Sequence, residues 1–85
     1  MQMEEKELLE TLIKLSVLPK YYSTGYEIKD YAYNIEQLAS GSYAYYYLER
    51  GEKLGYKEFG SKTEALGKLI GDLKFNLLNN TDLTQ

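Results

Sequence analysis

The sequence predicts a two-layer α+β domain, in which a three- to four-stranded antiparallel meander sheet carries an N-terminal and a C-terminal helix on one face. Two stretches with helical apolar periodicity bracket a tyrosine-rich middle that alternates in steps of two. Two helices with one apolar stripe each cover one face of a small sheet, so the other face is expected to stay open. A chain of 85 residues corresponds to a single domain.

The first helix is predicted at residues 4–17. Its apolar stripe is opposed by charged residues and consists of Leu8, Leu9, Leu12 and Ile13. Pro19 ends this helix, because a proline disfavours helical dihedral angles at the residue before it.

The second helix is predicted at residues 62–78, and Ser61 and Glu64 before it have the spacing of a capping box. Gly67 and Gly71 weaken this helix by about 1 kcal/mol each relative to alanine. We expect these glycines to allow close packing against the sheet or the first helix. Residues 80–85 are expected to form a frayed tail.

The strands lie between the helices. A turn leading into a short or irregular strand is expected at residues 21–28, and regular strands are predicted at 30–38, 43–50 and 53–59. Turns at residues 39–42 and around Gly51 join these strands into a meander.

Alternation divides the tyrosines between the two faces of the sheet. The side facing the helices is expected to hold Tyr31, Tyr33, Ile35, Tyr43, Tyr45, Tyr47 and Tyr56. Tyr46 and Leu48 then lie on the open face, near Glu36, Lys57 and Arg50. Tyrosine and arginine on an exposed sheet are typical of the centres of protein interfaces, although Tyr46 could equally serve cross-strand packing.

The composition argues against catalysis. The chain has no histidine and no cysteine, so it lacks an imidazole base, a thiolate nucleophile and their metal ligands. The carboxylates Glu49, Glu52 and Glu58 flank one turn, where solvated surface is a better interpretation than an acid–base pair or a cation site. We expect no enzyme activity, no cofactor and no metal.

The charge argues against nucleic acid and for a basic partner. The net charge is −3 and Arg50 is the only arginine, whereas phosphate binding depends on clustered cations. The rings sit among Glu and Ala rather than among the Lys, Arg and Gly of base-stacking sheets. Without a signal sequence or an apolar stretch long enough to cross a bilayer, the sequence predicts a soluble cytoplasmic protein without membrane contact.

The run "YYYLERGEKLGYKEFGSKTEA" at residues 45–65 resembles the central stretch of small immunity proteins from bacterial polymorphic toxin systems. In that family a Tyr-rich strand ends in Glu-Arg-Gly, a hairpin leads to a Lys-Glu-Phe strand, and a Ser-capped helix follows. "LPKYYS" at 18–23 and "AYNIEQ" at 32–37 also resemble the upstream pattern of the family. The chain departs from it at Tyr21 and Tyr43, where tryptophan is expected, and in the weakly acidic start of its last helix.

The resemblance implies binding without catalysis: a bacterial protein that occupies a cognate toxin domain, with a nuclease among the candidates. The expected partner contacts are Tyr46, Leu48, Glu49, Arg50, Glu36 and Lys57. Tyr46 would be the apolar anchor, Glu36 and Glu49 would meet basic groups, and Arg50 would make a bidentate contact or fix the turn. The alternatives are a phage or mobile-element inhibitor of a host defence protein and a homodimeric interaction module, and the sequence leaves monomer and homodimer open.

Overall fold

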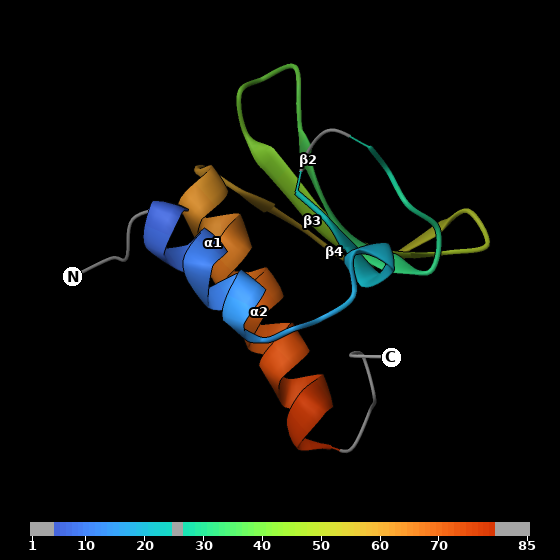
Figure 1. Ribbon diagram of the computed structural model, residues 1–85. Coiled ribbons are helices and arrows are strands. Elements are labelled where there is room, and N and C mark those ends of the chain that lie inside the picture. Colours follow the sequence, from blue (N-terminus) through green and yellow to red (C-terminus); the bar gives the residue numbers. More distant parts are fainter. Residues whose placement is uncertain (1–4, 25–26, 80–85) are drawn as a thin grey trace.

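The computed structural model describes residues 5–24 and 27–79, which form two α-helices, one 3₁₀ turn and four strands (Figure 1). Their bounds in chain order are α1 Glu5–Lys14, η1 Pro19–Tyr21, β1 Tyr22–Ser23, β2 Ala32–Gln37, β3 Tyr43–Glu49, β4 Glu52–Phe59 and α2 Lys62–Leu78. The predicted α+β class is confirmed. The predicted frayed tail and the first residue of the predicted N-terminal helix lie outside the described residues.

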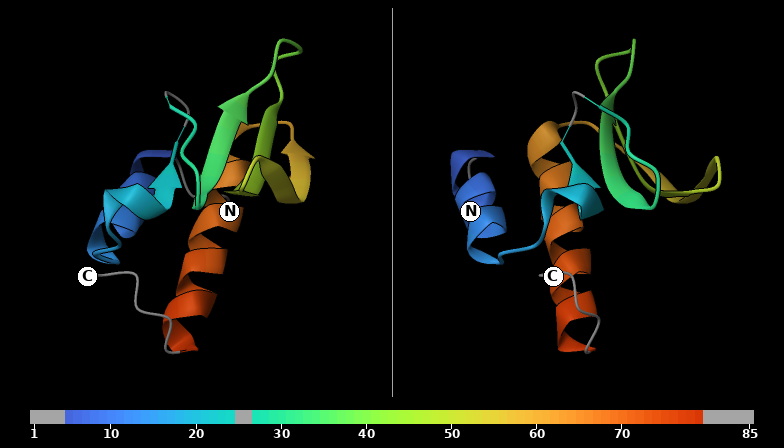
Figure 2. Two further views of the ribbon diagram at one scale, coloured as in Figure 1. Left: turned by 90° about the vertical axis from the view of Figure 1, so that its right-hand side faces the viewer. Right: turned by 45° about the vertical axis from the view of Figure 1, so that its right-hand side comes forward.

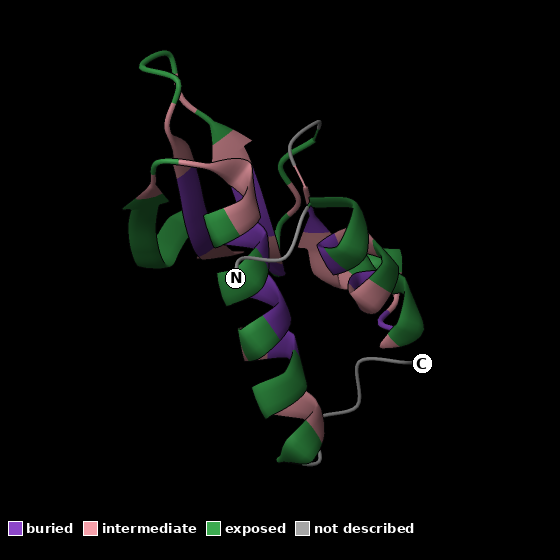
Figure 3. Cartoon of the chain, turned by 90° about the vertical axis from the view of Figure 1, so that its left-hand side faces the viewer, coloured by how far each residue is buried: buried purple, intermediate pink, exposed green. Residues whose placement is uncertain are grey.

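Helix α2 forms the layer beneath the sheet. Its first turn is capped as predicted, because the Oγ of Ser61 accepts a hydrogen bond from the backbone N–H of Glu64 at 3.2 Å. Its buried stripe consists of Ala65, Leu66, Leu69, Ile70 and Leu73. This helix contacts β2, β3 and β4 directly. Figure 3 shows the burial concentrated on one stripe of α2 and on the central strands.

Helix α1 packs against α2, which lies between α1 and the sheet (Figure 2). The two helices run in the same direction, and at their N-terminal ends the Nζ of Lys62 lies 4.0 Å from the Oε2 of Glu5. Helix α1 is shorter than predicted. It ends at Lys14, and Ser16 has a left-handed backbone with φ of 59° before Pro19 is reached. Neither helix in the described ranges is long and apolar enough to cross a membrane.

The sheet has the strand order β1-β2-β3-β4. Strands β2, β3 and β4 form the predicted antiparallel meander. The short first strand differs, because β1 pairs with β2 in parallel through Tyr22 opposite Tyr33 and Ser23 opposite Asn34. A parallel neighbour requires the chain to cross one face of the sheet before it re-enters in the same direction. The sheet is therefore mixed, and the connection between β1 and β2 becomes part of its surface.

The core between α2 and the sheet confirms the face predicted for Ile35 and Tyr45. Ile35 is fully buried, and Tyr45 is 3 % exposed. The hydroxyl of Tyr45 donates to the Oδ2 of Asp72 on α2 at 2.6 Å, and the Nδ2 of Asn76 donates to the hydroxyl of Tyr33 at 2.7 Å. Burial, and then the Asp72 carboxylate, raises the pKa of Tyr45. These two hydrogen bonds fix α2 along the strands.

The other tyrosines predicted for this side have three outcomes. Tyr43 packs against the core half-buried, and the half-buried Tyr47 ring lies 5.0 Å from the ring of Tyr33. Tyr31 is 48 % exposed and precedes β2 with a φ of 56°, so it does not join the core. Tyr56 lies on the opposite face of the sheet, so the expectation for this residue is wrong.

Gly67 and Gly71 do not mark a close approach. Both are exposed, and a methyl group added at either position would meet no atom within 4 Å beyond its own stretch of helix. The expected packing against the sheet or α1 is therefore wrong. The reason is geometric, because the two glycines lie four residues apart on the side of α2 turned away from its buried stripe.

Candidate protein-interaction face

The face of the sheet turned away from α2 is the candidate interaction site, and we call it the open face. The register assigns to it Ala32, Asn34 and Glu36 of β2, Ala44, Tyr46 and Leu48 of β3, and Lys53, Tyr56 and Glu58 of β4. The even-numbered positions of β2 and β3 therefore lie where the sequence places them.

A β-bulge in β4 changes the alternation of that strand. Tyr45 is opposite Lys57 and Tyr47 is opposite Leu54, which leaves Gly55 and Tyr56 together opposite Tyr46. Gly55 has a φ of 64°, a left-handed conformation that glycine adopts without steric cost. The extra residue moves every side chain that follows it to the other face.

The bulge explains two wrong expectations. Tyr56 joins the open face instead of the core, and its ring stacks on Tyr46 with the centroids 6.0 Å apart and the planes 16° apart. Lys57 moves the other way, and its ammonium lies 5.4 Å from the ring centroid of Phe59, a core-side residue. Lys57 therefore does not share a surface with Tyr46.

Tyr46 lies on the predicted face but is not an exposed anchor. It is 1 % exposed, because the ring of Tyr56 covers it and the ammonium of Lys53 lies 4.9 Å from its ring centroid. Its hydroxyl donates to the Oε1 of Glu36 at 3.3 Å. Burial, and then the Glu36 carboxylate, raises the pKa of Tyr46 to about 12. Tyr46 therefore lies beneath the surface of the open face and supports the ring of Tyr56, which is the ring that a partner would contact.

The accessible part of the open face is an ordered group of rings and charges. Tyr56 is 44 % exposed, and its hydroxyl donates to the Oε2 of Glu58 at 3.0 Å, which raises the pKa of Tyr56. The Nζ of Lys53 lies 3.9 Å from the Oε1 of Glu36 and 5.9 Å from the ring centroid of Tyr56. Leu48 is half-buried beside them. A partner would meet the ring of Tyr56, whose position is held by Tyr46 and Glu58.

The β3–β4 hairpin lies at the end of this surface, and the register places Glu49 and Glu52 on the side of Tyr47 and Leu54. Arg50 and Gly51 have φ values of 50° and 81°, the pair of left-handed residues that a type I′ turn requires. The Nε of Arg50 donates to the hydroxyl of Tyr31 at 3.3 Å. Glu49 and Glu52 are exposed and directly opposite one another. Like charges in that arrangement repel, so the hairpin favours a cationic neighbour.

Part of the open face is covered by the chain itself. The side chain of Asn34 is fully buried under the crossover segment, residues 27–31, and is bonded on both sides of its amide. Its Oδ1 accepts from the N–H of Lys29 at 2.9 Å, and its Nδ2 donates to the carbonyls of Lys29 at 3.0 Å and Ala32 at 2.9 Å. The crossover therefore closes the β1–β2 side and leaves the β3–β4 side open.

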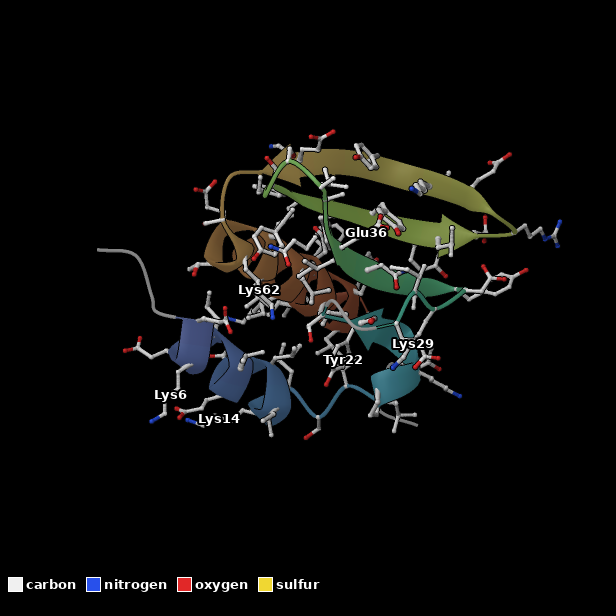
Figure 4. All side chains as sticks on the ribbon, turned by 90° about the horizontal axis from the view of Figure 1, so that it is seen from above. Lys6, Lys14, Tyr22, Lys29, Glu36 and Lys62 are labelled. Carbon is white, nitrogen blue, oxygen red and sulfur yellow. The ribbon has the colours of Figure 1, made fainter. Side chains whose placement is uncertain are left out.

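A pocket of about 210 Å³ lies beside the crossover. It is lined by Pro19, Tyr22, Ser23, Thr24, Glu27 and Lys29. The ammonium of Lys29 already donates to the carbonyls of Pro19 at 2.8 Å and Tyr22 at 3.3 Å, and Figure 4 shows Lys29 beside Tyr22. This pocket therefore lies where hydrogen bonds join the crossover segment to Pro19 and Tyr22. In the part of the chain that the structure describes, no group of three or more acidic side chains is placed to hold a metal ion.

Of the six residues proposed from the sequence, the structure brings Tyr46, Leu48 and Glu36 onto the open face and places Glu49 and Arg50 in the hairpin beside it. Lys57 is excluded by the bulge. Sequence reasoning missed Lys53, Tyr56 and Glu58. The signal that could have found them is Gly55, since an isolated glycine within a strand pattern often marks a bulge.

Comparison of the chain with models of protein families, with curated proteins and with solved structures finds no match.

Proposed function

We propose that this chain is a non-catalytic, immunity-type bacterial protein that binds and neutralises a cognate toxin domain, with a basic nuclease among the candidate toxins. The proposal keeps the partner implied by the resemblance of residues 45–65 and revises the contacts. The proposed contact residues are Tyr56, Lys53, Glu36 and Glu58 of the open face, together with Glu49 and Arg50 of the hairpin at its end.

The observation that carries the proposal is the fixed, half-exposed ring of Tyr56. It is stacked on Tyr46, flanked by Lys53 and bonded to Glu58 before any partner arrives. A side chain held in its bound position loses little conformational entropy on association, so more of its burial energy contributes to affinity. Tyrosines of this kind are typical of interface hot spots.

The charge around Tyr56 supports a basic partner. The open face and the hairpin carry the carboxylates of Glu36, Glu49, Glu52 and Glu58 against two cations, Arg50 and Lys53. Complementary charge of this kind raises the rate of encounter with a basic domain and disfavours acidic ones.

The test is binding to the toxin domain encoded beside this gene, in a variant without toxic activity, together with rescue of growth when the active toxin is co-expressed. Tyr56→Ala is expected to weaken binding by about tenfold to hundredfold, the range for loss of a central aromatic anchor. Phe75→Ala is the matched control. Phe75 is 66 % exposed on α2, away from the open face, so its loss should leave affinity unchanged.

The outcomes separate the function from the site. Absence of both binding and growth rescue would reject the immunity function. Binding that is insensitive to Tyr56→Ala but lost in Phe75→Ala would keep the function and move the site to α2. A gene neighbourhood of phage genes with a host defence protein as the captured partner would support the mobile-element alternative instead.

A further inference from the structure

Strand β4 is the exposed edge of the sheet. It is eight residues long and pairs with β3 on one side, and each of its residues except Phe59 is exposed. Leu54 and Tyr56 are 42 % and 44 % exposed on its two faces. Such an edge presents unpaired backbone groups that can accept another strand.

From the bulge and the charges of β4 we infer that this edge pairs, in antiparallel fashion, with β4 of a second copy of the chain. In a twofold antiparallel pair the two open faces lie on the same side, so each residue must oppose one that points to the same face. The bulge reverses the alternation between Leu54 and Tyr56. An odd-numbered residue before the bulge must therefore oppose an even-numbered residue after it, and an even-numbered residue before it must oppose an odd-numbered one.

One register satisfies this rule and uses the whole strand. It places Gly55 opposite Tyr56 of the second copy, so that both bulges lie at the twofold axis and all residues from Glu52 to Phe59 are paired. Registers displaced by two residues in either direction leave the strand ends unpaired and separate the two bulges. The bulge disfavours pairing with an unrelated strand. In this register, however, the bulge of one copy lies opposite the bulge of the other.

The charges fit the same register. Lys53 stands opposite Glu58 of the second copy on the open face, and the reciprocal pair forms as well. On the other face Leu54 stands opposite Lys57, whose aliphatic stem can cover it. No residue opposes a like charge. Directly opposite charges of this kind stabilise the pairing of two strands.

Lys53 can make this pair at little cost. Its ion pair with Glu36 is 3.9 Å long, and the Lys53 side chain is 49 % exposed. A surface ion pair of that length contributes little to stability, so the ammonium can turn toward a second copy. Pairing at the edge leaves the ring of Tyr56 facing outward. The open faces of the two copies then form one continuous surface. The dimer is therefore expected to form whether or not the partner is a toxin.

The interface is narrow, so we expect a weak dimer. Edge pairing of one strand buries less than about 1,200 Å², the range of transient complexes, and a dissociation constant in the micromolar range follows. Sedimentation velocity of the full chain from about 1 μM to about 1 mM should show a monomer that converts to a dimer. Backbone amides of β4 should exchange with deuterium more slowly at the dimeric end of that range.

A charge-exchange series tests the register. Lys53→Glu or Glu58→Lys alone should weaken the dimer at least about tenfold, because each introduces two like-charge pairs. The double variant, Lys53→Glu with Glu58→Lys, restores opposite charges and should dimerise as the parent does. Lys74→Glu on the exposed side of α2 is the control and should change nothing, and circular dichroism shows whether each variant is folded.

Two results would overturn the inference. One is a chain that stays monomeric over the whole concentration range, with exchange in β4 independent of concentration. The other is a dimer that the double variant fails to restore although it is folded, since pairing in this register requires that recovery.

Discussion

Tyr46 shows how one phenol can be placed on a sheet face and still be hidden from solvent. It is covered by the Tyr56 ring and the Lys53 ammonium, and its hydroxyl donates to Glu36. Its pKa is raised to about 12, whereas the pKa of a tyrosine in an unfolded chain is about 10. Between these values the unfolded state loses the proton first, so the free energy of unfolding falls as pH rises through this window.

Replacing Tyr46 with phenylalanine removes this titration. Tyr46→Phe should cost less than about 1 kcal/mol at neutral pH, because the lost hydrogen bond is long. Its free energy of unfolding should then fall less steeply than that of the parent between about pH 10 and 12. Urea denaturation at several pH values measures both. Equal slopes for parent and variant would show that the Tyr46 phenol ionises alike in the folded and unfolded chain.

The residues also show what the sequence could and could not establish about the site. Alternation correctly separates Tyr45 from Tyr46, because the alternation of β3 is unbroken. It fails at Tyr56 and Lys57, because the bulge at Gly55 reverses the faces in β4. It also cannot show that Tyr46 is covered, since the cover comes from side chains of a neighbouring strand.

Both ends of helix α2 are predictable from the sequence. A capping serine precedes it, an apolar stripe runs along it and an asparagine follows it, so local signals are sufficient to define the helix. Strand β1 is the opposite case. It is two residues long and has no pattern of its own, and its parallel pairing with β2 follows from tertiary structure. Local periodicity carries no information about such a partner.

The exposed glycines of α2 give a prediction about this element. Gly67→Ala and Gly71→Ala should each stabilise the chain by about 0.5–1 kcal/mol, because alanine reduces the entropy lost on helix formation. There is open space for the added methyl groups. Urea denaturation measures the gain.

Gly51→Ala is the control for this pair. Gly51 has a φ of 81° in the hairpin turn, so the same change should destabilise the chain there. A loss of stability at Gly67 or Gly71 would contradict the open space beside α2 and would indicate that another surface lies against this side of the helix.

The two sides of the whole molecule are covered by different means. Helix α2 covers one side with an apolar stripe, which the amino-acid sequence predicts. On the other side the crossover segment covers β2 through backbone groups that Asn34 pairs, while the β3–β4 side stays open. The sequence predicts the open face but not its boundary, because the boundary depends on a loop that the side-chain amide of Asn34 bonds to β2.

Asn34 therefore determines how far the open face extends. Asn34→Ala leaves buried N–H and C=O groups of the crossover without partners, and we expect a loss of about 3 kcal/mol in the free energy of unfolding. Asn34→Asp is the more informative change. When protonated, the introduced carboxyl can accept from the N–H of Lys29 and donate to one of the two carbonyls, whereas the ionised carboxylate can only accept.

Burial and the facing carbonyls would raise the pKa of the introduced carboxyl in the folded Asn34→Asp variant above its unfolded value of about 3.9. The folded state then holds the proton more tightly, so the stability of the variant relative to the parent is greatest at low pH and is lost as pH rises through the raised pKa. Denaturation of both chains from about pH 3 to about pH 8 measures this difference. Parallel curves would mean that the crossover lifts away from β2 in the variant, with the new carboxylate solvated and the open face extended to the β1 edge.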